Sequence, residues 1–201
     1  MMNNEQIESI VDTVAASGWC VTPGFLSIEE TAALRAECLA LHRADNFHRA
    51  GVGKGQAEVR GEIRGDHVLW VNDESAGPSL KPVLTRLEGL RQAVNRALLL
   101  GLFDLEMHFA VYPVGAGYQR HLDRFREDDR RTLTVILYLN PPDWGEEDGG
   151  QLLFWPDPEA APQVIVPTGG TLVTFLSDCY WHEVLPTTRE RLSLTGWFRR
   201  R

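Results

Sequence analysis

The chain places histidine and aspartate side chains at a spacing suited to binding a metal ion. A His-Leu-Asp sequence spans residues 121–123, and a further histidine, His182, follows in a strand-rich region. In a β-strand, residues i and i+2 project to the same face, so His121 and Asp123 would point into one cavity. Two imidazoles and one carboxylate on one face of a metal leave its opposite positions open, as in non-haem Fe(II) sites. The residues therefore predict that His121, Asp123 and His182 bind Fe(II).

The His-x-Asp sequence taken alone is weak evidence for a metal site. The chain has six histidines, and its composition gives roughly 0.4 such pairs by chance. The alternative interpretation is a histidine and an aspartate that share a hydrogen bond at the end of a strand. Further residues must therefore support the metal site.

An arginine nine positions after His182 adds a possible anion-binding group. The planar guanidinium of Arg191 can bind a carboxylate through two parallel hydrogen bonds, whereas a lysine offers only a point charge. Arg189 is equally suitable by composition, and an ordinary surface or salt-bridging arginine at a strand start is the alternative for Arg191.

Length and composition favour one enzyme domain over residues 1–201. The chain has 43% hydrophobic residues, which is sufficient for one sizeable core. Its net charge of -8 argues against a nucleic-acid or anionic-membrane surface, because phosphate binding needs a basic footprint. The start resembles no targeting segment and no stretch reaches about 18 apolar residues, so we expect a soluble cytoplasmic protein. The three cysteines are odd in number and far apart, which indicates reduced thiols.

The first half of the chain, about residues 1–101, has the patterns of supporting helices. Apolar residues at helical spacing predict a helix from Ile7 to Val14, and Ser27-Ile28-Glu29-Glu30 has the form of a capping box that opens a second helix to about Leu41. Leucines from Leu80 to Leu98 predict a third. Short strands are predicted at 19–21 and 67–71. The glycine-rich segment 50–65 has the composition of a loop, and we expect it to act as a lid.

The second half, about residues 105–201, changes to a period of two. Leu105, Met107, Phe109 and Val111 alternate with more polar residues, as in a half-buried strand. Further strands are predicted at 133–139, 151–154, 163–166, 171–176, 181–185 and 191–198. Many short antiparallel strands after a helical front predict an α+β, mainly β fold: a double-stranded β-helix (jelly roll) whose N-terminal helices support one face.

Ordered motifs along most of the chain carry a family resemblance. They are Gly18-Trp19-Cys20-Val21, Ile63-Arg64-Gly65-Asp66 with Trp70, Tyr112-Pro113, Gly117-Tyr118, His121-Leu122-Asp123, Leu137-Tyr138-Leu139-Asn140, Gly149-Gly150-Gln151-Leu152, His182-Glu183-Val184, and Arg191 with Thr195 and Trp197. Together they resemble the 2-oxoglutarate- and Fe(II)-dependent oxygenases, specifically the prolyl 4-hydroxylases of the oxygen-sensing type and their bacterial relatives. Collagen-type prolyl hydroxylases differ in using lysine at the position of Arg191.

The resemblance implies roles for individual residues. His121, Asp123 and His182 match the iron ligands, and Arg191 matches the residue that pairs with the distal carboxylate of 2-oxoglutarate. Tyr138 matches its hydrogen-bonding helper and Tyr112 a tyrosine near the metal, although a tyrosine on a strand is otherwise a packing residue. The last matches, in or near the substrate-contacting loop and rim, are Arg64, Asp66 and Arg131.

The resemblance also implies a reaction. With Fe(II), 2-oxoglutarate and O₂ as cofactor and co-substrates, and ascorbate in a supporting role, the chain would hydroxylate C4 of a prolyl residue in a protein substrate and release succinate and CO₂. A translation factor is one candidate substrate. The alternatives are an oxygenase on the same scaffold that acts on a small molecule or a nucleic acid, and a non-catalytic module that senses a metal or carboxylate. The sequence leaves the oligomeric state open.

Overall fold

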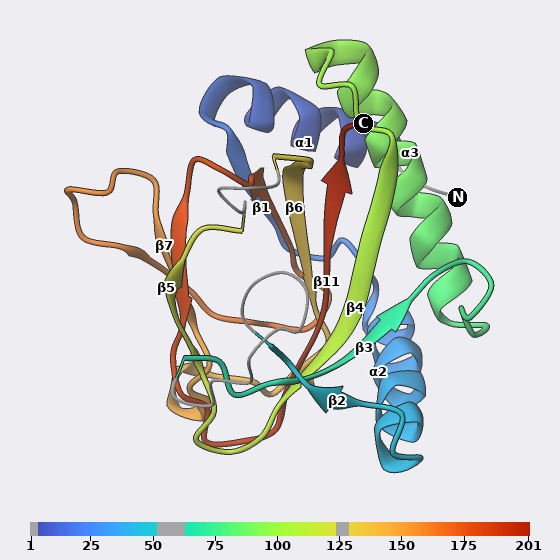
Figure 1. Cartoon of the computed structure of the whole chain (residues 1–201), viewed down its shortest axis with the longest axis vertical. Coiled ribbons are helices and arrows are strands. Elements are labelled where there is room, and N and C mark those ends of the chain that lie inside the picture. Colours follow the sequence, from blue (N-terminus) through green and yellow to red (C-terminus); the bar gives the residue numbers. More distant parts are fainter. Residues whose placement is uncertain (1–3, 52–62, 124–128) are drawn as a thin grey trace.

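Two antiparallel sheets and a layer of helices make up the computed structural model, which describes residues 4–51, 63–123 and 129–201 (Figure 1). The helices are α1 (Asn4–Ser17), α2 (Ile28–Arg43) and α3 (Leu80–Leu98), with a short 3-10 helix η1 (Glu146–Asp148). The strands of the larger sheet, in spatial order, are β1 (Trp19–Thr22), β9 (Leu172–Leu176), β6 (Arg131–Tyr138), β11 (Arg191–Arg199), β4 (Asp104–Tyr112), β3 (His67–Val71) and β2 (His48–Arg49). The smaller sheet has the order β5 (Tyr118–His121), β10 (Trp181–Val184), β7 (Leu152–Trp155) and β8 (Gln163–Ile165).

The three long helices lie where the apolar periodicity predicts them and cover one face of the larger sheet. Their buried residues form one core with the side chains of β4, β6 and β11 that point toward the helices, such as Phe109, Val135 and Leu194. The capping box is confirmed, because Ser27 Oγ accepts from the Glu30 N–H at 3.1 Å and Glu30 Oε2 accepts from the Ser27 N–H at 2.8 Å. Arg86 on α3 donates to Glu30 at 2.6 Å, which joins the two helices.

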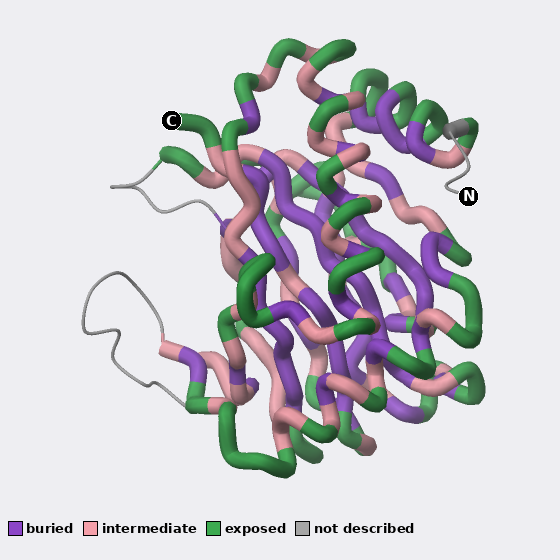
Figure 2. Tube along the Cα trace, turned by 90° about the vertical axis from the view of Figure 1, so that its right-hand side faces the viewer, coloured by how far each residue is buried: buried purple, intermediate pink, exposed green. Residues whose placement is uncertain are grey.

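A second core fills the space between the two sheets, and it changes the prediction for β4. The alternating pattern predicts a half-buried strand, but every residue from Met107 to Tyr112 is buried. The helices cover the face that carries Phe109, while the smaller sheet covers the face that carries Ala110. The centre of the molecule is therefore built from strands buried on both faces (Figure 2).

Two short strands were absent from the sequence prediction. β2 and β5 are 2 and 4 residues long and have no fully buried residue, so they lack the apolar alternation that signals a strand. Most of the predicted lid, residues 52–62, lies outside the described residues. At its described ends, the Ala50 N–H donates to the Asp66 carbonyl at 3.0 Å. Of the helices in the described ranges, none has the length and apolar character needed to cross a membrane.

Packing of α3 against the larger sheet should account for a large part of the stability. Leu87 is fully buried in the helix-facing core, so Leu87→Ala should leave a cavity and lower the free energy of unfolding by about 2–5 kcal/mol. Urea titration of both variants gives the measurement, with Leu99→Ala as the control because Leu99 is 84% exposed. Equal losses in the two variants would contradict this account of the helix layer.

Candidate active site

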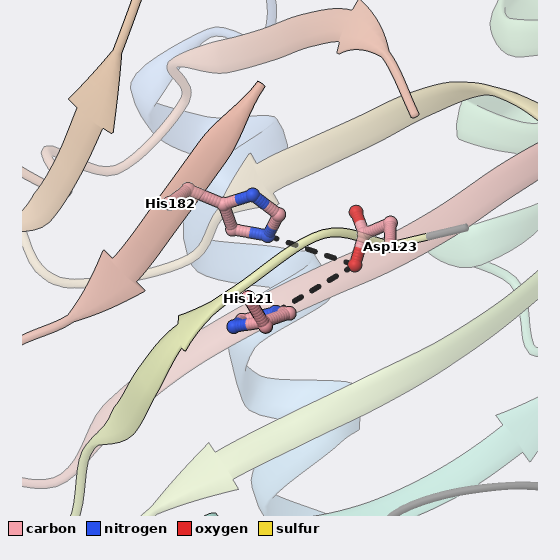
Figure 3. Close-up of side chains that lie close together, drawn as sticks. All are labelled: His121, Asp123 and His182. Carbon is pink, nitrogen blue, oxygen red and sulfur yellow. Dashed lines mark ion pairs between the residues drawn. The ribbon is translucent and has the colours of Figure 1, made fainter. Parts of the chain in front are cut away.

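The structure brings His121, Asp123 and His182 together between the two sheets (Figure 3). Asp123 Oδ1 lies 3.7 Å from His121 Nε2 and 3.6 Å from His182 Nε2. One potential ligand atom from each residue falls within 4.8 Å of the other two. His182 and Asp123 are buried, whereas His121 is partly exposed, so the cluster is open to solvent on one side. This is the cluster that the spacing predicts.

The route by which Asp123 reaches this cluster differs from the prediction. The His-x-Asp spacing predicts that His121 and Asp123 lie on one strand. In the structure β5 ends at His121, and Asp123 lies in a bend beyond it. The prediction that both residues share one strand is therefore wrong. A residue of the larger sheet positions the Asp123 carboxylate instead, because the Thr134 hydroxyl on β6 donates to Asp123 Oδ2 at 2.9 Å. The aspartate therefore links the two sheets.

The backbone fixes which nitrogen of each imidazole faces the cluster. His121 Nδ1 lies 2.6 Å from the Gln119 carbonyl oxygen, and His182 Nδ1 lies 3.1 Å from the Tyr180 carbonyl oxygen. A carbonyl oxygen can only accept, so each Nδ1 carries the proton and each Nε2 presents a lone pair. Both imidazoles thus have the tautomer that a metal ligand bound through Nε2 requires.

The electrostatics of the cluster favour a cation. Burial lowers the pKa of His121 to about 3, so this imidazole is neutral at physiological pH. Burial also lowers the pKa of His182, but the Asp123 carboxylate outweighs it and raises the pKa above its ordinary value. The carboxylate therefore favours a positive charge at His182 Nε2, as a proton or as a metal ion, and in the metal-binding form two imidazole lone pairs and a carboxylate oxygen converge on that charge. The donor set of two nitrogens and one oxygen fits Fe(II).

Arg191 provides a buried positive charge in the same interior. It is 1% exposed, and its Nε donates to the Gly150 carbonyl at 2.9 Å. The guanidinium carbon lies 4.8 Å from the centroid of the Tyr112 ring and 5.2 Å from that of Tyr138. Within the described ranges, no carboxylate forms an ion pair with Arg191. Because an unpaired buried charge is costly, this site fits an anionic ligand.

The alternative arginine and the two tyrosines have distinct surroundings. Arg189 is 39% exposed and pairs with Asp148 at 3.1 Å, which leaves Arg191 as the buried one. The buried Tyr138 hydroxyl finds no hydrogen-bond partner among the residues that the structure describes, so it is free to donate to a ligand. Burial raises the pKa of Tyr138 to about 12 and also raises that of Tyr112, so both phenols keep their protons.

One cavity is lined by both the histidine and aspartate cluster and Arg191. Its floor includes one face of β11, because successive residues of a strand alternate in direction. That row consists of Arg191, Ser193, Thr195 and Trp197. β4 runs alongside, with Tyr112 opposite Arg191 and His108 opposite Thr195. The larger sheet thus supplies the anion-binding end and the smaller sheet supplies the two imidazoles.

The structure places the three residues predicted for the substrate side in different positions. Arg64 lines the cavity and binds Asp66 through two hydrogen bonds of 2.6 and 2.8 Å. Asp66 is 1% exposed, so it holds Arg64 in place from the interior. Arg131 forms an ion pair of 2.6 Å with Glu106 and lies 3.5 Å from the centroid of the Trp197 ring. Arg64 therefore contacts the cavity directly, whereas Arg131 packs behind its wall.

Sequence reasoning missed two aromatic residues of the cavity. His108 is fully buried in the cavity wall, and burial lowers its pKa well below the ordinary value. Its ring lies 4.8 Å from that of Trp70, which is 46% exposed. Tyr118 stacks on His121 with ring centroids 3.6 Å apart. The available signal was alternation, since His108 shares a strand face with Tyr112.

Known proteins with similar sequences and structures include oxygenases. Residues 107–199 match the model of the 2OG-Fe(II) oxygenase superfamily. The crystal structure of a Pseudomonas putida prolyl-4-hydroxylase is 43% identical to this chain, with a TM-score of 0.87 and coverage of 97% of this chain and 99% of that one. This similarity confirms the predicted double-stranded β-helix with supporting helices.

Two more distant relatives are also prolyl hydroxylases. One from Trichoplax adhaerens, solved in complex with a hypoxia inducible factor oxygen degradation domain peptide fragment, is 28% identical with a TM-score of 0.85, over 97% of this chain and 89% of that one. The hypoxia-inducible factor prolyl hydroxylase of Caenorhabditis elegans is 26% identical over 204 residues. That match includes 95% of this chain but only 28% of the C. elegans protein, so the chain corresponds to a part of it.

The close approach of Gly150 to Arg191 gives a test of the anion-binding end. A Cβ at position 150 would lie 2.7 Å from Arg191 Cδ, so Gly150→Ala should displace the guanidinium. We expect 2-oxoglutarate affinity to fall on the order of 10- to 100-fold, as for other small misplacements of a binding group, with Mn(II) affinity unchanged. Calorimetric titration of each ligand gives the measurement.

Gly24→Ala is the matched control for this prediction. Gly24 has φ +66, close to the +67 of Gly150, but a Cβ there meets no atom of the described residues within 4 Å. The two variants therefore share the backbone strain and differ in the contact with Arg191. The interpretation fails if both variants bind 2-oxoglutarate equally well.

Proposed function

The chain belongs to the 2OG-Fe(II) oxygenase superfamily, and from this premise we propose that it hydroxylates C4 of a prolyl residue within a protein substrate. The observation that carries the proposal is that one cavity holds both a two-histidine, one-carboxylate cluster and a buried arginine. The 43% identity to the P. putida prolyl-4-hydroxylase supports proline as the target. The C. elegans and T. adhaerens relatives support a protein as the substrate.

The three clustered residues would hold Fe(II). His121 and His182 would bind through Nε2, because their Nδ1 protons are committed to backbone carbonyls. Asp123 would bind through Oδ1, the oxygen that lies nearest to both imidazoles. Three ligands on one side of an octahedral ion leave three positions for other molecules. When bound, iron with 2-oxoglutarate and O₂ supplies the oxidising chemistry, in which 2-oxoglutarate becomes succinate and CO₂ and an oxygen atom enters the C4–H bond.

Arg191 would hold the distal carboxylate of 2-oxoglutarate. Its fork matches a carboxylate, and the dry surroundings strengthen the charge-assisted hydrogen bonds. Tyr138 would donate its otherwise unpartnered hydroxyl to the same carboxylate. Tyr112, whose ring lies against the guanidinium, would keep water from that side. These contacts orient the co-substrate along the floor of the cavity.

The peptide substrate would bind on the side of the cavity that Arg64 lines. We assign Arg64, fixed by Asp66, to the contact with the peptide, because it lines the cavity beside the cluster. Arg131 would act indirectly by supporting Trp197. A translation factor as substrate, a supporting role for ascorbate, a cytoplasmic location, the action of residues 1–201 as one domain and a lid over 50–66 stay predictions.

The metal and 2-oxoglutarate sites can be tested without knowing the substrate. Anaerobic addition of Fe(II) and 2-oxoglutarate to the wild-type protein should produce the visible charge-transfer band of a chelated ketoacid. Asp123→Ala should lose the band because it removes the one anionic ligand among the described residues of the cluster. Asp157→Ala, which removes an exposed carboxylate, is the control and should retain it. A wild-type protein that binds iron without the band would favour a sensor.

The choice of proline can be tested with a pool of random peptides that each contain one proline. The proline pool should raise succinate release above the rate without peptide, and mass spectrometry should find one added oxygen atom on the proline. The same pool with alanine in place of proline should leave succinate release at the peptide-free rate. Release that depends on neither pool, although the charge-transfer band forms, would favour a small-molecule substrate.

A further inference from the structure

We propose that Thr134 and Ser177 form a hydroxyl pair that keeps Asp123 a one-oxygen ligand and so preserves the open metal positions. The inference rests on the proposed function, because it concerns the same metal site. Thr134 and Ser177 are positioning residues: Thr134 contacts the ligand Asp123, Ser177 contacts Thr134, and neither would contact the metal or a substrate. Their role follows from the two oxygens of the Asp123 carboxylate, which have different surroundings.

The first oxygen of Asp123 faces the imidazoles and the second faces the larger sheet. Oδ1 lies 3.6 Å from His182 Nε2, whereas Oδ2 accepts a hydrogen bond of 2.9 Å from the Thr134 hydroxyl. Thr134 lies on β6 between β9 and β11, so its position is fixed on both sides. An interior strand of the larger sheet therefore holds Oδ2 on the side away from the imidazoles.

The direction of the hydrogen bonds follows from the chemistry of the groups. An ionised carboxylate can only accept, so the Thr134 hydroxyl must donate its single proton to Oδ2. The Ser177 hydroxyl lies 2.9 Å from the Thr134 hydroxyl, and it must therefore be the donor of that second bond. Thr134 and Ser177 are both buried, with 0% of their surface exposed. The chain of donation runs from Ser177 to Thr134 to Asp123 and ends at the carboxylate.

This chain has a consequence for the number of open metal positions. A carboxylate can bind a metal through one oxygen or through both, and the second mode uses an additional coordination position. The reaction needs three free positions, two for the ketoacid end of 2-oxoglutarate and one for O₂. Because the hydrogen bond from Thr134 turns Oδ2 toward the larger sheet and uses one of its lone pairs, metal binding through Oδ1 alone is favoured. The hydroxyl pair thus acts against the two-oxygen mode.

The larger sheet supplies a matched control. Thr174 on β9 is also 0% exposed, and its register partner Val135 is the residue next to Thr134. Its hydroxyl has no hydrogen-bond partner within the part of the chain that the structure describes. Thr174→Val therefore makes the same chemical change as Thr134→Val in the same sheet, without touching Asp123. A difference between the two variants reports on the bond to the carboxylate.

Mn(II) binding by calorimetry is the first measurement, made on the full chain without iron. Thr134→Val should weaken Mn(II) binding about 10- to 100-fold, the usual effect of removing a hydrogen bond to a metal ligand. Ser177→Ala should weaken it less, because Thr134 can still donate. Thr134→Ser, which restores a hydroxyl, and Thr174→Val should bind Mn(II) as the wild type does.

Water proton relaxation by bound Mn(II) is the second measurement, and a merely structural role for Thr134 would not move it. The wild-type site should leave three metal positions to water, and two-oxygen binding of Asp123 would leave two. At saturating Mn(II), Thr134→Val should therefore lower the relaxivity of bound Mn(II) by about one third. Thr174→Val should not change it.

The outcomes separate this inference from the proposed function. If wild-type protein binds no Mn(II) and gives no charge-transfer band with Fe(II) and 2-oxoglutarate, the metal site itself is wrong and the inference falls with it. If wild type binds normally and Thr134→Val equals Thr174→Val in affinity and relaxivity, only the inference is overturned. Should Thr134→Val fail to fold, Ser177→Ala and Thr134→Ser decide the question: equal Mn(II) affinity in these two overturns the inference.

Discussion

Asp123 and Arg191 carry opposite charges in the same buried interior, yet they form no ion pair with each other, and both belong to the described part of the chain. A buried charge without a partner costs several kcal/mol, so each needs another form of compensation. Asp123 has two imidazoles and a threonine hydroxyl, while Arg191 has one backbone carbonyl and two tyrosine rings. None of these partner groups carries a permanent charge. The interior is thereby suited to a cation at one end and an anion at the other, as an iron chelate of a dicarboxylate provides.

The packing of the two sheets determines where those charges lie. The smaller sheet contributes His121 and His182 from two adjacent strands, and the larger sheet contributes Arg191 and the cavity floor. The larger sheet is covered by helices on its other face, so its interior strands β4, β6 and β11 are buried on both sides. Close packing of this kind resists displacement, and the floor of the cavity can hold side chains at fixed positions.

The groups that hydrogen-bond to His121, Asp123 and His182 determine which atoms these residues present to a metal. Backbone carbonyls select the tautomer of both histidines, and Thr134 selects the available oxygen of Asp123. None of these groups would bind the metal itself, yet each determines what a ligand presents to it. The same fold can host unrelated reactions, so such contacts, together with the buried arginine, distinguish this site from a generic jelly roll.

The sequence by itself determined the helices, most of the strands and the identity of the main site residues. Periodicity reports which face of an element is apolar, and the His-x-Asp, His182 and Arg191 motifs report chemistry that few side chains provide. Only the tertiary structure decided that β4 is buried on both faces, that Asp123 lies beyond the end of β5, and that His108 belongs to the cavity. It also decided that Thr134 contacts the Asp123 carboxylate and that Ser177 contacts Thr134. Each of these depends on contacts between residues far apart in the sequence, and local patterns carry no information about which distant strands will pack together.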